Sequence, residues 1–364
     1  MQIDFHHAVT YVVARYAGFA HREAAIVAHC AQYVDDATNA GTISFTNGAM
    51  FTRIASAHKM LDYRNFDELA NHHCWIPFHF LPGNGGKPMG ENPKGSFIDK
   101  IICRPNSYVA QDMVRSTILD QDQLYGLHRL GVAMHVYADT WAHQGFAGVN
   151  HRINDIRALD DHDQPDEGFL DRLKDRFEGR FDRIASKFVG DALPLGHGAA
   201  LSHPDKPYLK WSYRDADGNK VERDNPKNFL EAAEQMCITM QRYRVRDPDA
   251  NVPGLSQIGR DKIDHLLRTI TDSDGDERHQ QWLQHIGEGH FGFPAVRLEY
   301  QSKDTGSWKH EATGTQKHMD EEDDHFEYHP SFLGSDWKLF HDAIWAHRFD
   351  LIHDILPRYG ICAA

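Results

Sequence analysis

Histidine and aspartate side chains form a regular stripe inside the apolar stretch 124–146. His135, Asp139 and His143 are each four residues apart, and His128 lies two turns before His135. On an α-helix this spacing places the side chains on one face, about a turn apart. Two imidazoles with a carboxylate between them are a ligand set for zinc or a similar divalent ion. The pattern favours a metal site over a buried stripe in which Asp139 hydrogen-bonds both imidazoles.

Further ligand-type residues lie where predicted elements end. The pair Asp35-Asp36 closes a predicted helix over residues 21–36, where carboxylates oppose the helix dipole unless a cation offsets them. For Asp36, a solvated side chain and a metal-linked one are equal alternatives. His79 lies between two phenylalanines in the segment 72–83, where an unpaired imidazole would be costly, so a metal is a good candidate partner.

A second group of ligand-type residues, His197, His203 and Asp205, follows in the segment LPLGHGAALSHPD. Residues 208–223 read as a β-hairpin with Asp217-Gly218 at its turn. The acids of that turn do not follow the spacing of a calcium loop. A calcium site is therefore not expected at this turn.

Hydrophobic periodicity predicts a chain made mainly of helices. The segment 72–83 is expected to be extended, residues 83–96 to form a Gly/Pro-rich loop, and residues 300–326 a long polar loop. Asn225 is expected to cap the helix that Pro226 opens. The predicted helices besides the central one cover residues 5–17, 21–36, 46–61, 107–120, 167–189, 225–246, 256–271, 276–286 and 336–356.

The composition of the chain limits the classes of function that it can have. The 364 residues carry a formal charge of −14, which disfavours a sequence-independent grip on nucleic acid. No apolar run is long enough for a membrane span, and no signal peptide is evident, so a cytoplasmic location is the default, with export by a non-cleaved route as the alternative. Five widely spaced cysteines form no disulfide framework, whereas 26 histidines raise the expectation of a metal site.

Five segments in order resemble one known group of proteins: DFHHAVTY, QYVDDAT, IPFHFLPG, LGVAMHVYADTWAHQGF and LGHGAALSHPD. They resemble the zinc-dependent phospholipase C and single-strand nuclease superfamily, and most closely an uncharacterised bacterial branch. The resemblance covers residues 1 to about 205 and leaves 206–364 without a recognised motif. It implies one large mainly α domain, residues 1–364, built as a multi-helix bundle with small β-hairpin and loop insertions. It also implies a cluster of two or three zinc ions, with another divalent metal as the alternative.

Carried over residue by residue, the resemblance assigns roles to specific side chains. His135 and Asp139 match the family's HxxxD motif, and Asp139 would bridge two metals. His79 and either Asp35 or Asp36 would complete the first zinc site. A further zinc would be held by His6 or His7 together with the α-amino group of Met1. Because Gln2 has a bulky side chain, Met1 is expected to be retained on the chain.

The last predicted metal site departs from the family pattern. His143 comes slightly earlier than the family's histidine, and Leu201 stands where an acid should follow His197. Asp205 or His203 would have to substitute, and a dinuclear cluster is the alternative.

The implied activity is hydrolysis of phosphate esters, phospholipase C-like or nuclease-like, with Asp35, Asp36 and Asp139 as catalytic candidates. The substrate would be a small phosphate ester or a phospholipid. Trp75, Phe78, Phe80 and Trp141 would line its pocket or belong to the core. Three rivals are a non-catalytic metal-binding protein, a secreted toxin or effector with phospholipase activity, and a plain helical interaction protein.

Overall fold

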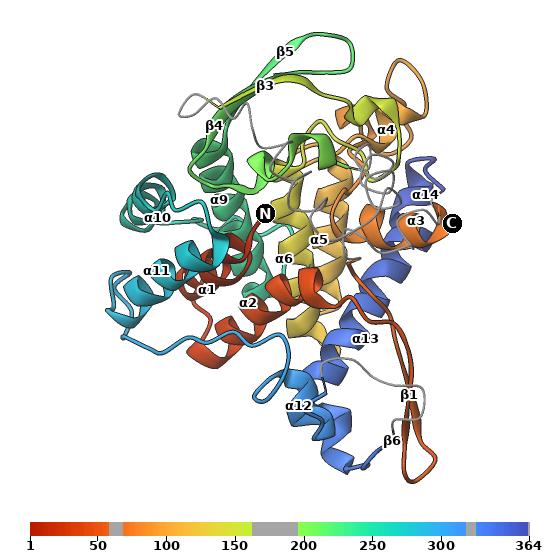
Figure 1. Cartoon of the computed structure of the whole chain (residues 1–364), viewed down its shortest axis with the longest axis vertical. Helices are drawn as coiled ribbons and strands as arrows, with labels where there is room; N and C mark the ends of the chain where they lie inside the picture. The colour runs from red at the N-terminus through yellow and green to blue at the C-terminus, as the bar shows by residue number, and fades with distance from the viewer. Residues whose placement is uncertain (58–67, 162–195, 318–324, 363–364) are drawn as a thin grey trace, which may run out of the picture.

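The computed structural model describes residues 1–57, 68–161, 196–317 and 325–362. Within these ranges the protein is mainly α-helical (Figure 1). A π-helical turn, Asp4–Val9, runs directly into α1, Thr10–Tyr16. The other helices are α2 (His21–Asp36), α3 (Glu68–Phe78), α4 (Ile98–Ile101), α5 (Tyr108–Leu119), α6 (Gly126–Ala142), α9 (Asn225–Val245), α10 (Gln257–Thr269), α11 (Gly275–Gly287), α12 (Trp308–Thr313), α13 (Asp336–Phe349) and α14 (Leu356–Arg358).

Two small three-stranded sheets lie at the margins of the helices (Figure 1). In one, β1 (Gly41–Phe45) pairs antiparallel with β2 (Met50–Arg53) and parallel with β6 (His325–Phe326). In the other, β3 (Arg157–Asp161), β4 (Lys210–Arg214) and β5 (Lys220–Asp224) form antiparallel pairs. The β4–β5 pair confirms the hairpin predicted for residues 208–223.

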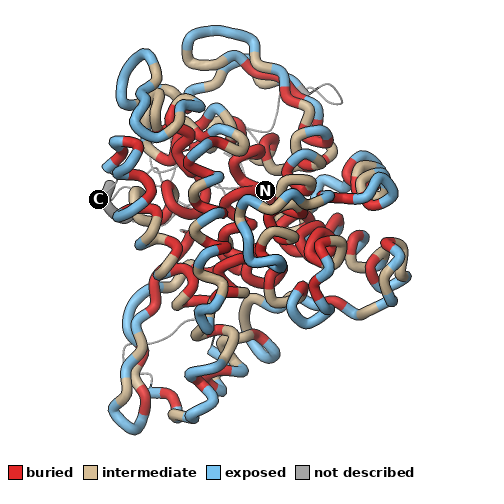
Figure 2. The backbone as a smooth tube through the Cα atoms, turned by 180° about the vertical axis from the view of Figure 1, so that it is seen from behind, coloured by how far each residue is buried: buried red, intermediate tan, exposed pale blue. Residues whose placement is uncertain are grey.

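The helix α6 occupies the middle of the molecule, and Figure 2 shows its surroundings as buried backbone. It is apolar or small on nearly every side, as a helix enclosed by others must be. At Gly131 it meets α2 so closely that an added Cβ would lie 2.5 Å from Cys30 Cβ and from Val27 O. The missing side chain therefore sets the distance between the two helices.

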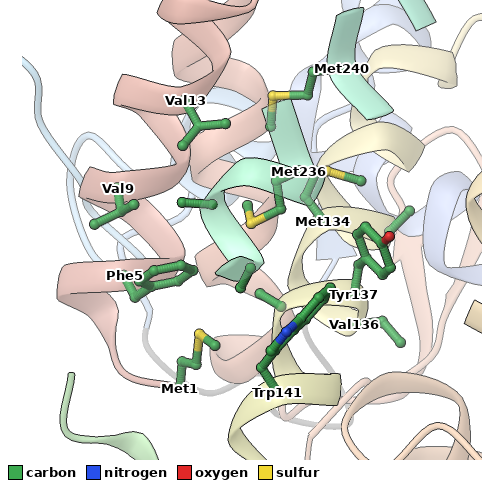
Figure 3. Packing of buried hydrophobic residues seen from close by; sticks show 14 of the residues in the cluster. Met1, Phe5, Val9, Val13, Met134, Val136, Tyr137, Trp141, Met236 and Met240 are labelled. Atoms are coloured by element: carbon green, nitrogen blue, oxygen red, sulfur yellow. The ribbon is translucent and has the colours of Figure 1, made fainter. Parts of the chain in front are cut away.

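The N-terminal helix and α9 pack against the same core (Figure 3). Phe5, Val9 and Val13 of the N-terminal helix belong to the same hydrophobic cluster as Met236 and Met240 of α9. Phe5 meets Phe229 of α9 edge to face, with ring centroids 5.0 Å apart. This packing carries the first residues of the chain into the interior, next to Trp141 of α6.

Two of the sequence predictions are wrong in the described residues. Of the helix predicted for 46–61, residues 46–57 are not helical, because 41–53 form the β1–β2 hairpin around the turn at Asn47-Gly48, and 58–61 lie outside the described residues. The segment 72–83 is not extended at its start, because α3 continues to Phe78 with Pro77 inside its last turn. Pro77 removes one backbone hydrogen bond, the one from its own position to the carbonyl four residues earlier, and the helix ends one residue later.

Smaller corrections concern helix ends and loops. The cap of α9 is Asp224, whose side chain accepts from Lys227 N, so Asn225 is instead its first residue. The polar segment 300–326 contains the short helix α12. Ser107 caps α5, and its side chain accepts from the backbone nitrogen of Ala110. The helix predicted for residues 167–189 lies outside the described residues.

In the described part of the chain, no helix combines the length and the apolar character that crossing a bilayer requires.

Candidate metal centre

The first half of the centre lies where α6 passes the carboxyl end of α2. His135 and Asp139 project from the same side of α6, with His135 Nε2 3.3 Å from Asp139 Oδ2. His79, just beyond α3, places Nδ1 3.6 Å from that oxygen and 3.2 Å from His135 Nε2. Asp35, at the end of α2, adds a carboxylate oxygen 3.7 Å from His79 Nδ1 and 3.8 Å from His135 Nε2.

The carboxylate of Asp139 lies between two groups of ligand-type atoms. Its Oδ2 faces the ring nitrogens of His135, His79 and, at 3.6 Å, His143 Nδ1. Its Oδ1 is 2.6 Å from the α-amino nitrogen of Met1 and 3.2 Å from Nε2 of His6. A carboxylate that offers one oxygen to each side has the placement of a bridging ligand.

The second half of the centre is made by His143, His197 and Asp205. Asp205 Oδ1 lies 3.3 Å from His143 Nε2, and its Oδ2 lies 3.4 Å from His197 Nε2. The same Oδ1 is 3.3 Å from the Met1 nitrogen, so Asp205 and Asp139 share the N-terminus. Asp205 thus stands where the acid expected after His197 is missing.

Three groups of potential ligands result, each with its ligand atoms within 4.8 Å of one another. Such groups of buried or half-buried imidazoles and carboxylates could hold a metal ion. They are His6–Asp35–His135, His79–His135–Asp139 and His143–His197–Asp205.

Main-chain carbonyls fix the orientation of four imidazoles. Because a carbonyl can only accept, the bonded ring nitrogen must carry the proton, and the other nitrogen is left to bind a metal. The pairs are His79 Nε2 with Ser56 O (2.9 Å), His135 Nδ1 with Ala31 O (2.7 Å), His143 Nδ1 with His79 O (2.7 Å) and His197 Nδ1 with Leu201 O (2.9 Å).

His6 lacks such a partner. Both of its ring nitrogens are buried without a hydrogen bond, and so is Oδ2 of Asp139. The His6 ring stacks on His135 with centroids 3.9 Å apart. Buried polar atoms without partners are costly, and cations on the two sides of Asp139 would satisfy its Oδ2 and one ring nitrogen of His6.

Electrostatics gives three of the imidazoles and Asp139 the protonation states that metal binding requires. Burial lowers the pKa of His135 and of His197 to about 4 each, and that of His6 well below its usual value. Burial alone would raise the pKa of Asp139, but His143, the N-terminal amine and His135 outweigh it and hold that pKa well below the usual range. Neutral imidazoles and ionised carboxylates are the forms that ligate.

The protonated α-amino group of Met1 supplies positive charge among the carboxylates. Burial lowers its pKa, but Asp139, Asp205 and Asp35 more than compensate and raise it to about 11. Desolvation raises the pKa of Asp35 well above its usual value, and Asp139 adds to this. A metal bound to this amine would displace its proton.

The structure separates the alternatives that the sequence left open. His6 faces the centre, whereas His7 Nδ1 pairs with His279 Nε2 at 2.8 Å. Asp36 turns away from the imidazoles: its Oδ2 accepts from Tyr300 Oη at 2.6 Å.

Of the two candidates for the last site, Asp205 contacts the histidines. His203 Nδ1 instead donates to Ala200 O at 3.1 Å. His128 lies outside the centre as well, because its Nε2 pairs with Asp336 Oδ1 at 2.8 Å.

Arg223 of β5 fixes the end of α6 beside His143. Its Nη2 donates to Trp141 O at 2.9 Å and Ala142 O at 2.8 Å, and its Nη1 donates to Gln144 O at 3.1 Å. A cation at the carboxyl end of a helix satisfies the last carbonyls and the helix dipole. Nothing in the sequence pattern points to this role, because β5 is distant in the chain.

A groove of about 1320 Å³ leads to the centre. Met1 and Asp35 belong both to its lining and to the ligand-type groups. The opposite wall is formed by the start of α11 and the segment 295–302, which brings Asp274, Asp276 and Glu299 to the groove. These walls were not predicted, since loop and helix-end residues carry no periodic signal.

The four aromatic side chains considered for a substrate pocket do not line this groove. Phe78 and Trp141 are fully buried in the core. Trp75 and Phe80 lie behind the imidazoles, Phe80 stacked on His143 with centroids 4.5 Å apart. They therefore shape the centre from behind.

A family model described as a family of unknown function, DUF6765, matches residues 1–355, so the chain belongs to that family. Neither a curated protein nor a solved structure matches the chain.

Proposed function

We propose that the protein is a metal-dependent phosphoric ester hydrolase, with zinc as its metal, and a helical bundle of the phospholipase C and nuclease type. The observation that carries the proposal is the set of unsatisfied buried ligand atoms around Asp139, with the other imidazoles held by carbonyls. Divalent ions bound there would supply Lewis-acid activation of water and neutralise the charge of a phosphate ester. The resemblance of five sequence segments supports this class of reaction.

The residues divide into ligands and a proton acceptor. Asp139 would bridge, while Asp35 would ligate beside His79 and His135. Asp36 lines the same groove, and hydrogen bonds from Tyr300 and Gln32 hold its carboxylate there. We assign proton acceptance from the attacking water to Asp36.

The groove favours small substrates. Its rim carries the carboxylates of Asp274, Asp276 and Glu299, and the exposed Arg297 is paired with Glu299 at 2.5 Å. Together with the net charge of −14 this repels a polyanion such as nucleic acid. A small phosphate ester or a phospholipid headgroup fits the charge better.

Elemental analysis of untagged protein, purified without chelator, tests the proposal. Two or three zinc per chain are expected, lost together in the double variant His135→Ala, Asp139→Ala. Asp36→Asn should keep its metal and lose hydrolysis of a simple phosphodiester, which separates ligation from proton acceptance. Wild-type protein without stoichiometric metal would overturn the proposal.

The N-terminal amine has its own test. An extension before Met1 should lower the metal content, because the α-amino nitrogen is fully buried between Asp139 and Asp205. The same extension after the C-terminus is the control. Equal metal content in the two forms would remove the amine from the ligand set.

A further inference from the structure

A buried arginine of α11 grips the first residues of the chain. Arg278 is fully buried, and its Nε donates to Asp4 Oδ2 at 2.7 Å. Its Nη2 donates to Gln2 Oε1, and its Nη1 donates to the carbonyl of Asp272 at 2.7 Å. One guanidinium therefore binds two of the first four residues and ties them to the start of α11.

The start of α11 lies directly against this segment. A Cβ added to Gly275 would lie 3.1 Å from Gln2 Oε1 and 3.5 Å from Arg278 Nη2. The absence of a side chain at this position lets the helix and the N-terminal segment approach closely. The Arg278 guanidinium also lies over the ring of Tyr208, with its carbon 5.6 Å from the ring centroid.

The gripped segment connects to the metal centre on both sides. Gln2 O accepts from the backbone nitrogens of Phe5 at 2.9 Å and His6 at 3.0 Å, so Gln2 and His6 share one turn. On the other side, the Met1 nitrogen reaches Asp139 at 2.6 Å. A contact that fixes the side chain of Gln2 therefore also fixes the positions of the Met1 amine and of His6.

His6 and the amine differ from the other potential ligands in how they are oriented. Four imidazoles are fixed by carbonyl acceptors, but neither ring nitrogen of His6 has a hydrogen-bond partner. Apart from its stacking on His135 and its approach to Asp139 Oδ1, the position of the His6 ring is then set by the backbone that carries it. Gln2 begins that turn and Asp4 lies within it, and Arg278 holds both.

A buried ion pair is a costly way to gain stability, since desolvation offsets most of the attraction. Asp4 and Arg278 are both fully buried, and Asp4 Oδ1 has no hydrogen-bond partner. Apolar side chains would fill this space at lower cost, whereas a guanidinium fixes several acceptors at set angles. The pair is better suited to positioning than to stability.

From these contacts we propose that Arg278 is a positioning residue for the metal centre, holding the α-amino group of Met1 and the imidazole of His6 in place. The proposal rests on the proposed function for its consequence, the loss of a metal. Its structural core, the grip on the N-terminus, is measurable without any metal.

The test compares Arg278→Lys and Gln2→Leu with wild type in metal-free protein. A brief pulse of an amine-acylating reagent at pH 7, followed by mass spectrometry of the N-terminal peptide, reports how accessible the amine is. We expect at least about tenfold faster acylation in Arg278→Lys and an intermediate rate in Gln2→Leu, which loses only the Nη2 contact. Both variants, reloaded with zinc, should hold about one ion fewer than wild type.

Arg129→Lys is the matched control. Arg129 is also buried and pairs with two carboxylates, Asp120 and Asp350, but it does not touch the N-terminus. It should lower the melting temperature without exposing the amine, which separates positioning from general stability.

Wild-type acylation rates in both Arg278→Lys and Gln2→Leu would overturn the positioning role. Rates raised equally in Arg129→Lys would overturn it as well. If wild-type protein takes up no zinc, the proposed function fails, while the acylation rates still decide whether Arg278 holds the N-terminus.

Discussion

At the scale of single residues, Asp139 has the most contacts with the other ligand-type groups. One oxygen faces the N-terminal amine and His6, and the other faces His135 and His79. The sequence spacing predicted its helix face and its proximity to His135. It could not show which side chains from distant segments would meet its two oxygens.

Replacing Asp139 with asparagine should therefore weaken metal binding at more than one position. Asparagine keeps the shape but removes the negative charge that both groups share, so we expect metal affinity to fall by about 100-fold or more. Competition with a chromogenic chelator measures this. Asp36→Asn, one residue from a proposed ligand but facing Tyr300, should retain wild-type affinity. Equal affinity in Asp139→Asn and wild type would contradict a bridging role.

At the scale of elements, the crossing of α2 and α6 determines where His135 meets Ala31 O and Asp35. The crossing is close because Gly131 has no side chain. A Cβ at this position would displace α2, and with it the carbonyl that orients His135.

Gly131→Ala should therefore destabilise the protein by about 1–3 kcal/mol through overpacking. Gly287→Ala is a matched control, because Gly287 ends α11 and an added Cβ meets nothing closer than Val296 O at 3.8 Å. Denaturant unfolding of both variants gives the difference. A Gly131→Ala variant as stable as Gly287→Ala would show that α2 adjusts without cost.

The helices with strong periodicity could be predicted from the sequence, and α6, α2 and α10 are examples. The β1–β2 hairpin was missed although Asn47-Gly48 is a strong turn signal between β-branched and aromatic residues. In α3, proline and aromatic residues suggested an extended chain, but packing overrode that preference: Phe78 stacks on His347 of α13, centroids 5.6 Å apart. Tertiary contacts of this kind have no local signature.

The candidate site could be predicted in part. Local spacing identified the ligand types, but the choices between His6 and His7, Asp35 and Asp36, and Asp205 and His203 depend on which way each backbone turns. The π-helical turn at residues 4–9 rotates His6 toward Asp139 and His7 toward His279. Because a π-helical turn departs from the period of a regular α-helix, the sequence pattern could not show which of the two histidines faces Asp139.

At the scale of the whole molecule, several histidines outside the centre are buried in neutral form. Burial lowers the pKa of His29, His341 and His347 to about 3 each. Each would take up a proton on unfolding once the pH falls below about 6.5. The unfolded chain then binds more protons than the folded one, so stability decreases as the pH drops from 6.5 toward 3.

Metal-free protein should therefore lose stability steeply below pH 6, by about 1.4 kcal/mol per pH unit for each such histidine. Melting temperatures measured between pH 7 and pH 4.5 test this. His341→Leu removes one of the three groups and should make the decline shallower. An unchanged melting temperature down to pH 4.5 would contradict neutral burial.

The centre gathers its ligands from separate parts of the chain, from residue 6 to residue 205. An ion held by His6, Asp35 and His135 would be a chemical cross-link that closes the loop of 129 residues between His6 and His135 (135 − 6). A disulfide persists in the unfolded chain and restricts it, whereas this ligand set exists only once the segments have converged. The ion would therefore stabilise the completed fold and leave the unfolded chain unrestricted.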